Sequence, residues 1–366
     1  MKPTYLLFAI SLACCFTACK PDFDLNGPYK DVTIVYGVLN HQDSIHYVKI
    51  YKGFQSHETN AVFVDAKNPE NINIYYYDFK NQKSLITVVL QEFDKDKMIK
   101  EIPLYVTHEF ERDSGFFYYD KEKILYYTKE KLNKGRFYKI KITHNETGKI
   151  TEGMTPLLGN GTGNNFEIYS PSNQTELFER TGSVSFYEAE YATDYELHVN
   201  FLYCDVNKKT KEVTNHKIVK NICPRVGEKW VLLESGYYNK KYTKTFFDDI
   251  AANVKPNPEV TRYIGFVDKD GKISNGTCIQ VEGWAAGESM VKYLLSNQPT
   301  SSFTQINTIY TNLEVKGEGL AFGFFSSKAK TDIRSYSVSS RSEDSLMMNP
   351  KTSNLGFRPW SEYKKP

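Results

Sequence analysis

The sequence contains no apolar run long enough to cross a bilayer as a helix. Its one strongly apolar stretch, Tyr5 to Ala18, is shorter than the roughly 20 residues that a membrane-spanning helix needs. The early cation Lys2 precedes this stretch, and small residues lead from it to Cys19. This layout is typical of a secretory signal, so residues 1–18 are predicted to be removed on export.

The residues around Cys19 resemble a lipoprotein processing site. Phe16-Thr17-Ala18-Cys19 is similar to the lipobox of bacterial lipoproteins, with Phe16 where the family usually has Leu, and the lipobox cysteine carries the lipid. Ser11-Leu12-Ala13-Cys14 is the alternative, but it leaves a second apolar cluster in the mature chain. Cys19 is therefore predicted to carry acyl chains such as palmitate, each buried methylene of which adds about 0.8 kcal/mol of membrane affinity.

The segment after Cys19 has two interpretations. Lys20-Pro21-Asp22-Phe23-Asp24 resembles the short acidic export signal of Bacteroidota surface lipoproteins, which implies an outer-membrane protein exposed at the cell surface. The same residues also suit a solvated acidic tether, and both interpretations stay open. In either case, residues 19–28 are predicted to form a tether.

The chain has almost no net charge, because 46 Lys and Arg balance 44 Asp and Glu. Removal of the signal takes away only Lys2 and leaves the mature chain close to neutrality. Without a basic tract there is no electrostatic footprint for nucleic acid or for an anionic membrane face. Nucleic acid is therefore excluded as a partner.

Cysteine is scarce after the signal, where only Cys204, Cys223 and Cys278 remain. Exported proteins fold in compartments that permit disulfides. Cys204 and Cys223 flank two expected strands, and a hairpin of those strands could bring the two thiols together as a disulfide. The seven histidines are scattered without the four-ligand spacing of a zinc site, so no metal and no other cofactor is predicted.

Catalytic motifs are also missing. The sequence has no Gly-x-Ser-x-Gly elbow, no His-Glu-x-x-His helix and no cysteine paired by spacing with a histidine. The glycines of 159–163 do not form a phosphate-binding loop, because no Lys-Ser or Lys-Thr pair follows them. The sequence therefore predicts a protein that is not an enzyme.

Aromatic residues are abundant, with 27 Tyr and 23 Phe, and β-branched residues recur in short runs. This composition indicates a mostly β fold. Val32 to Val38 and Ile45 to Tyr51 alternate in polarity around turn residues, and about seven short strands are expected before residue 150. We therefore predict that residues 29–150 form an immunoglobulin-like β-sandwich domain.

A second β-rich domain is expected after a break in the pattern. Pro156 and several glycines interrupt residues 151–165, which are interpreted as an inter-domain linker. Residues 166–335 are predicted to form a β-rich domain with two short helices, Tyr242 to Val254 and Gly287 to Asn297, and 336–366 a C-terminal tail. The apolar stripes of both helices are interpreted as core contacts.

Runs of adjacent aromatics suggest a binding surface. Neighbouring residues on a strand point to opposite faces, so not all members of such a run can enter one core. The predicted binding aromatics are Tyr75, Tyr77, Phe117 and Tyr119. Tyrosine suits sugar stacking or a protein partner, and the alternative is that these rings form cross-strand pairs that hold the sheets together.

Several longer segments resemble one protein family. The opening "DVTIVYGVLNHQDSIHYVKIYKGF", the segment "TKTFFDDIAANVKPNPEVTRYIGFVD" and the element Tyr310-Thr311-Asn312-Leu313 are similar to uncharacterised Bacteroidota outer-membrane lipoproteins with a two-part β domain of unknown function. Val315-Lys316-Gly317-Glu318 departs from the tighter Asn-Gly turn of that family. Such proteins often occur beside TonB-dependent transporters, which implies an accessory or binding role and no particular functional residues.

Two short motifs resemble O-glycosylation acceptors of the same bacteria. Asp43-Ser44-Ile45 and Asp344-Ser345-Leu346 place Ser44 and Ser345 at the acceptor position. A mass shift on either peptide would identify the modification.

Taken together, these features predict a lipid-anchored outer-membrane lipoprotein with a non-catalytic binding or transporter-accessory role. Its expected partners are the membrane, through the N-terminal lipid, and a TonB-dependent transporter or a glycan or peptide ligand. The alternative is a structural or adhesive, fimbria-like surface component, which would need an open sheet edge for strand donation. A hydrolase is the third hypothesis and would require paired acids in a deep cleft.

Overall fold

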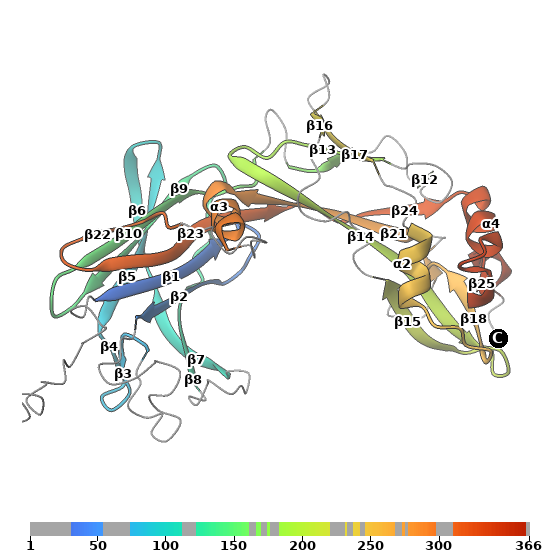
Figure 1. Ribbon diagram of the computed structural model, residues 1–366, viewed down its shortest axis with the longest axis horizontal. Helices are drawn as coiled ribbons and strands as arrows, with labels where there is room; N and C mark the ends of the chain where they lie inside the picture. Colours follow the sequence, from blue (N-terminus) through green and yellow to red (C-terminus); the bar gives the residue numbers. More distant parts are fainter. Residues whose placement is uncertain are drawn as a thin grey trace, which may run out of the picture.

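The chain folds into two β-rich lobes that are joined by long strands (Figure 1). The computed structural model describes residues 31–53, 74–111, 122–160, 166–169, 174–175, 183–219, 231–232, 237–241, 246–267, 273–274, 277–297 and 310–363. No helix in these ranges is both long and apolar enough to cross a membrane. The predicted mostly β fold is confirmed.

One large sheet runs through both lobes. Its strands, in spatial order, are β25 (Phe357–Arg358), β18 (Val260–Ile264), β14 (Ala192–Asn207), β21 (Thr277–Gly287), β23 (Leu320–Lys330), β1 (Val32–Leu39), β2 (His46–Lys52), β8 (Glu122–Thr128) and β7 (Tyr105–Glu111). Beside this path, β15 (Val213–Val219) pairs with β14, and β24 (Arg334–Val338) pairs with both β21 and β12 (Gln174–Thr175). The long strands β14, β21 and β23 span the distance between the lobes (Figure 1).

The first lobe is a β-sandwich. A second sheet, with the order β22 (Leu313–Lys316), β10 (Ile150–Pro156), β9 (Phe137–His144), β5 (Ile86–Asp94) and β6 (Lys97–Pro103), faces the strands β23 to β7 of the large sheet. Alternate residues of both sheets, such as Val35, Ile50, Leu90 and Ile140, are buried together between them. The predicted sandwich is therefore observed, and its immunoglobulin-like strand order stays a prediction.

Strand β23 belongs to both lobes. Its residues 320–327 pair in parallel with β1, and its last three residues pair antiparallel with β21. Its partner β22, just before it in the sequence, pairs antiparallel with β10 at the edge of the second sheet of the sandwich. A chain segment near residue 320 therefore completes a lobe that begins at residue 31.

The boundaries drawn from the sequence differ from this arrangement. Strand β10 runs to Pro156, so the expected linker 151–165 starts inside the sandwich. The expected second domain, 166–335, supplies β22 and β23 to the first lobe. These strands pair with residues more than 150 positions away, and local alternation in a sequence carries no information about such pairing.

The segment 336–366, expected to be a tail, is part of the second lobe. It contains α4 (Ser340–Met348), two 3₁₀ turns (Ser353–Leu355 and Trp360–Glu362) and strand β25, and its Leu346 and Phe357 lie in the second core. Arg262 of β18 holds it in place. The buried Arg262 guanidinium donates to the Leu355 carbonyl and lies 3.2 Å from the carboxylate of Asp205.

Smaller sheets complete the described part of the chain. They are formed by β11 (Ile168–Tyr169), β13 (Ser183–Tyr187), β17 (Tyr237–Lys241) and β16 (Val231–Leu232), by β19 (Phe266–Val267) with β20 (Ile273–Ser274), and by β3 (Tyr77–Asp78) with β4 (Lys83–Ser84). Phe186 of β13 and Ile168 of β11 pack into the core of the second lobe.

Both predicted helices are present as α2 (Phe246–Asn253) and α3 (Glu288–Ser296). Ile250 of α2 is fully buried in the second core, as the stripe predicts. The core interpretation is wrong for α3, which has no buried residue. Helix α4 was not predicted, although Ser339 caps it by accepting the amide proton of Ser342.

A substitution of Gly323, in the middle of β23, tests how closely β1 and β23 approach each other. Its φ is +88°, and a Cβ atom there would lie 2.0 Å from the Val35 carbonyl oxygen. Gly323→Ala should lower the free energy of unfolding, measured by urea denaturation, by more than about 3 kcal/mol. Gly148→Ala is the matched control, because Gly148 has φ +70° with no atom within 4 Å, and should cost only about 1 to 2 kcal/mol. Equal losses in the free energy of unfolding for the two variants would contradict the close approach of β1 and β23 at Gly323.

Candidate functional site

Several predicted site residues lie outside the described residues, namely Cys19, Phe117, Tyr119 and Cys223, and the predictions for the first three stand as made. Ser44 is exposed in the turn between β1 and β2, where a modifying enzyme could reach it. Ser345 is half-buried in α4, and its carbonyl accepts the amide proton of Asn349. The glycosylation of both serines stays a prediction.

Tyr75 and Tyr77 are core residues, and the prediction that they form a binding surface is wrong. Their exposed fractions are 0% and 4%, and Tyr76 between them is also buried. The Tyr75 ring lies 5.5 Å from that of Tyr51, and the Tyr77 ring lies 5.2 Å from that of Phe79. Only the last of the three tyrosines is in a strand, so the alternation of a regular strand does not apply, and all three rings enter one core.

The predicted disulfide between Cys204 and Cys223 is not formed. The expected hairpin exists as β14 and β15, but its register places His216 opposite Cys204. Cys204 is a free, buried thiol, and burial raises its pKa to about 11. A thiol held in its neutral form at pH 7 is a poor nucleophile, so Cys204 is a packing residue.

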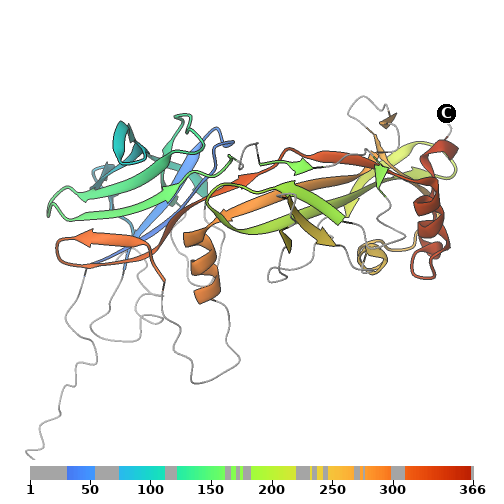
Figure 2. The same ribbon diagram turned by 90° about the horizontal axis from the view of Figure 1, so that it is seen from above.

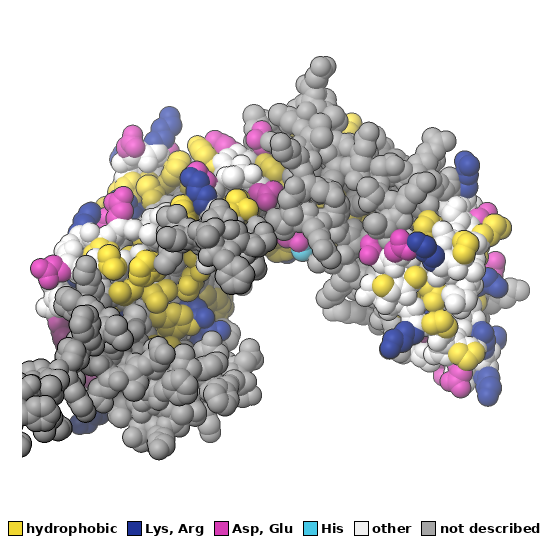
Figure 3. Space-filling model, in the orientation of Figure 1, with side chains coloured by type: hydrophobic (Ala, Val, Ile, Leu, Met, Phe, Trp, Pro, Cys, Tyr) yellow, Lys and Arg dark blue, Asp and Glu magenta, His cyan; other side chains and the backbone are white. Residues whose placement is uncertain are grey.

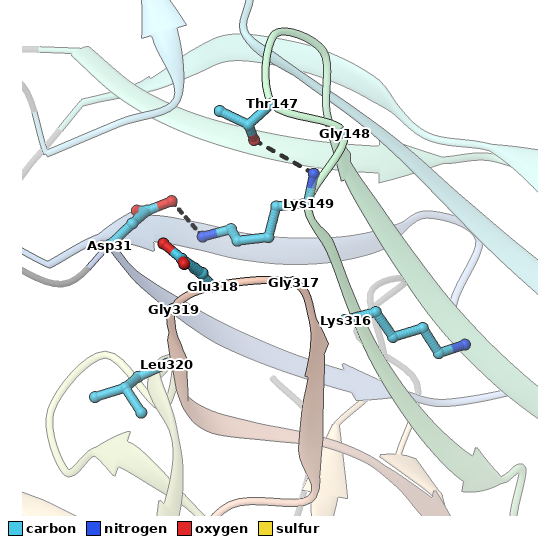
Figure 4. A pocket seen from close by; sticks show the side chains of 9 residues that line it. All are labelled: Asp31, Thr147, Gly148, Lys149, Lys316, Gly317, Glu318, Gly319 and Leu320. Atoms are coloured by element: carbon cyan, nitrogen blue, oxygen red, sulfur yellow. Dashed lines mark hydrogen bonds and ion pairs between the residues drawn. The ribbon is translucent and has the colours of Figure 1, made fainter.

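A hollow of about 730 Å³ lies at the start of β1 in the first lobe. It is formed by Asp31, the β9–β10 turn around Lys149 and the β22–β23 turn from Lys316 to Leu320 (Figure 4). The Lys149 side chain is buried, and its ammonium group donates to the Asp31 carboxylate and, over 3.1 Å, to the Thr33 hydroxyl. Figure 4 shows this ammonium group directed at Asp31 rather than into the open space.

Several polar groups around this hollow bind one another. The Tyr76 hydroxyl donates to Asp31 over 3.2 Å, and the His144 Nε2 atom lies 3.4 Å from the Thr33 hydroxyl. Lys316, on the opposite rim, is paired with Glu152 at 2.7 Å. A buried network whose members satisfy one another rigidifies the fold. We therefore interpret the hollow as a clamp on the start of β1 and not as a ligand site.

Helix α3 forms the other notable feature, at the junction of the lobes. Figure 2 shows it on the side of the large sheet that faces away from the second sheet of the sandwich. Its Tyr293 ring packs 4.6 Å from Phe324 of β23, and its hydroxyl lies 3.1 Å from that of Tyr36 in β1. The Met290 amide donates to the Ser326 hydroxyl over 3.2 Å. These contacts fix the helix on the shared strand.

The opposite side of α3 borders an apolar groove of about 130 Å³. Leu294 and Leu295 line it with exposed fractions of 52% and 56%. The other lining residues are Met290 and Val291 of α3, Asp194, Tyr195 and Glu196 of β14, Trp284, Ala285 and Ala286 of β21, and Lys328 of β23. These two neighbouring leucines therefore leave an exposed apolar surface beside the groove.

Trp284 is the anchoring aromatic of the groove. Its indole N–H donates to Glu282 over 2.8 Å, and the ammonium groups of Lys328 and Lys330 lie 5.0 and 5.7 Å from its ring. Glu196 is its cross-strand neighbour on β14 and is paired with His198 at 3.1 Å. The groove therefore has an apolar floor, a carboxylate wall on β14 and a basic wall on β23.

The arrangement suits binding. Among the residues that the structure describes, no three or more His, Cys, Asp or Glu side chains are grouped to hold a metal ion. The apolar stripe expected for the helix from Gly287 to Asn297 is present on α3 as Met290, Val291, Leu294 and Leu295, but it lines the groove and not the core. Trp284 was not predicted, because a single Trp in a strand gives no periodic signal.

Comparisons with protein-family models, with curated proteins and with solved structures find no match for this chain.

His144 should make the first lobe less stable in mild acid. Burial, and then the neighbouring Lys149 ammonium, lower the pKa of His144 below its usual 6.5, and Asp31 opposes this shift. The unfolded chain therefore binds the proton first, and the free energy of unfolding falls as the pH drops below about 6.5, by up to about 1.4 kcal/mol per pH unit. Burial also lowers the pKa values of His41 and His46. These two histidines therefore also lower the free energy of unfolding as the pH falls.

The measurement is urea denaturation of the wild type and His144→Gln between pH 7.5 and 5.0. The variant should show a shallower loss of stability over this range, with the remaining loss due to His41 and His46. Parallel pH profiles of the two proteins would contradict the assignment.

Proposed function

We propose that this protein is a lipid-anchored outer-membrane lipoprotein, exposed at the cell surface, with a non-catalytic role as an accessory to a TonB-dependent transporter. The observation that carries the binding role is the apolar groove beside α3. The proposed lipid anchor rests on the lipobox that ends at Cys19. The proposed transporter partner rests on the resemblance of the longer segments to Bacteroidota outer-membrane lipoproteins.

The groove favours an extended polypeptide of the transporter as its occupant. Leu294 and Leu295 offer apolar area, and Trp284 and Tyr195 are the residue types that dominate binding energy in protein interfaces. Asp194 and Glu196 along one wall suit a segment with a basic residue next to its apolar anchor. A glycan is less favoured, because the Trp284 ring already has two lysines close to it.

The adhesive alternative receives less support. Strand β6 is an edge of the second sheet in the sandwich, which is what strand donation requires. However, this strand carries Lys97, Lys100 and Glu101 and ends at Pro103. Charged residues and proline on an edge strand are features that prevent pairing with another chain.

Site-specific photo-crosslinking in intact cells tests the binding role. A photoreactive residue at position 294 should crosslink to a TonB-dependent transporter, whereas one at Met348, which is 76% exposed on α4, should not. Replacing Leu295 with Glu should reduce the crosslink from position 294 at least about tenfold, which corresponds to 1.4 kcal/mol. Equal crosslinking from both positions, or none from position 294, would contradict the proposal.

A further inference from the structure

The chain also crosses between the lobes directly after β10. Leu157 and Leu158 are neighbours in the sequence, but Leu157 is buried in the core of the sandwich and Leu158 in the core of the second lobe. The Leu157 amide donates to the Arg136 carbonyl over 2.8 Å, and the Leu157 carbonyl accepts from the Gly135 amide over 2.9 Å. This crossing is therefore fixed to both lobes.

A further contact between the lobes is made by the turn that precedes β14. The buried Ala189 places this turn in the second lobe, and the Glu190 amide donates to the Asn160 carbonyl over 2.7 Å. From this turn the Tyr191 ring reaches the first lobe, where it lies 5.4 Å from the Phe137 ring of β9, edge to face. We call the contact between Tyr191 and Phe137 the latch.

The latch is placed where it can fix the angle between the lobes. Figure 3 shows the lobes diverging from their junction with an open space between them, so contacts at the junction set this angle. Phe137 belongs to the second sheet of the sandwich, and stacked sheets lie about 10 Å apart. The latch is therefore offset from the long strands of the large sheet and opposes their bending.

The backbone of Tyr191 supports a specific role for its side chain. Its φ is +65°, a left-handed conformation that is uncommon for a bulky residue. The ring is 46% exposed, so burial in a core does not account for this conformation. Strained backbone conformations occur mainly at functional sites, where the surrounding structure imposes them.

The start of β14 connects the latch to the apolar groove. Asp194 lines the groove and follows Tyr191 closely in the chain. The register of β14 against β21 shifts between Ala192 and Asp194, so regular strand pairing does not hold this segment. Across the groove, α3 is held to the shared strand by the packing of Tyr293 on Phe324. Both sides of the groove are thus held to the first lobe, α3 directly and the start of β14 through the latch.

We propose that Tyr191 and Phe137 are positioning residues that hold the groove in the shape that its partner binds. This inference rests on the proposed function, because it takes the groove as the binding site. A site that is already in its bound shape loses less conformational freedom on binding. Loss of the latch should therefore weaken binding although neither residue lines the groove.

Distances between two spin labels test whether the latch fixes the lobes. The labels are attached at Ile99→Cys on β6 and at Met348→Cys on α4, which are 53% and 76% exposed in the wild type. The protein is the mature chain with Cys19 and Cys223 replaced by Ser, and its other two cysteines are buried. With the latch intact, the two labels should give one narrow distance distribution.

Two substitutions of Tyr191 separate its ring from its backbone. Tyr191→Asn removes the ring and introduces a residue that tolerates the left-handed conformation, and it should widen the distance distribution by at least about half. Tyr191→Phe keeps the ring and should leave the distribution unchanged. If Tyr191→Asn does not fold, Phe137→Thr removes the other ring with a residue that suits a strand and should widen the distribution equally.

Crosslinking from position 294 in intact cells is the second readout. It should fall at least about twofold in Tyr191→Asn and keep its wild-type level in Tyr191→Phe. An unchanged distance distribution in Tyr191→Asn, a wider distribution without loss of crosslinking, or equal results for the two variants would overturn the proposal. A wild type that does not crosslink would contradict the proposed function itself, and the positioning role would fall with it. The spin labels need no partner, so they tell the two failures apart.

Discussion

The parallel pairing of β1 with β23 is the constraint on which the rest of the molecule depends. Eight residues of each strand pair in register, and β23 then continues into the antiparallel pair with β21. Loss of this pairing would open an edge of the sandwich and remove the connection to the second lobe at the same time. The φ of +88° at Gly323, directly against the Val35 carbonyl, shows how little room the pairing leaves.

The apolar groove beside α3 follows from the same pairing. Tyr293 of α3 packs on Phe324 of β23 and bonds to Tyr36 of β1, so the groove is built on the shared strand. If the protein is anchored as proposed, a pull between the tether and the second lobe would act on the start of β1 and the end of β23. A parallel pair pulled at opposite ends resists through all its hydrogen bonds together.

Local features of the fold could be predicted from the sequence, whereas pairings between distant segments could not. The β14–β15 hairpin, α2 and α3 depend on residues close together in the chain, and their patterns predict them. The pairing of β22 and β23 with the first lobe depends on contacts between residues far apart, which one sequence does not contain. Tyr75 and Tyr77 were misplaced because a strand was assumed where the chain is irregular.

In the candidate site, too, local features could be predicted and distant contacts could not. The apolar stripe of α3 was read correctly, but whether it faces a core or a groove depends on the sheet beneath it. The alignment of Tyr47, Tyr105 and Tyr127 is also invisible in the sequence, since these residues come from three separated segments. Registers of β2, β8 and β7 bring them together.

Calorimetry of the mature chain with Cys19 replaced by Ala tests most directly whether β23 makes the two lobes one unit. The structure predicts a single transition in which the calorimetric and van't Hoff enthalpies agree, because neither lobe can lose the shared strand alone. Two separated transitions, one for each lobe, would show that the strand does not couple them and would contradict the account.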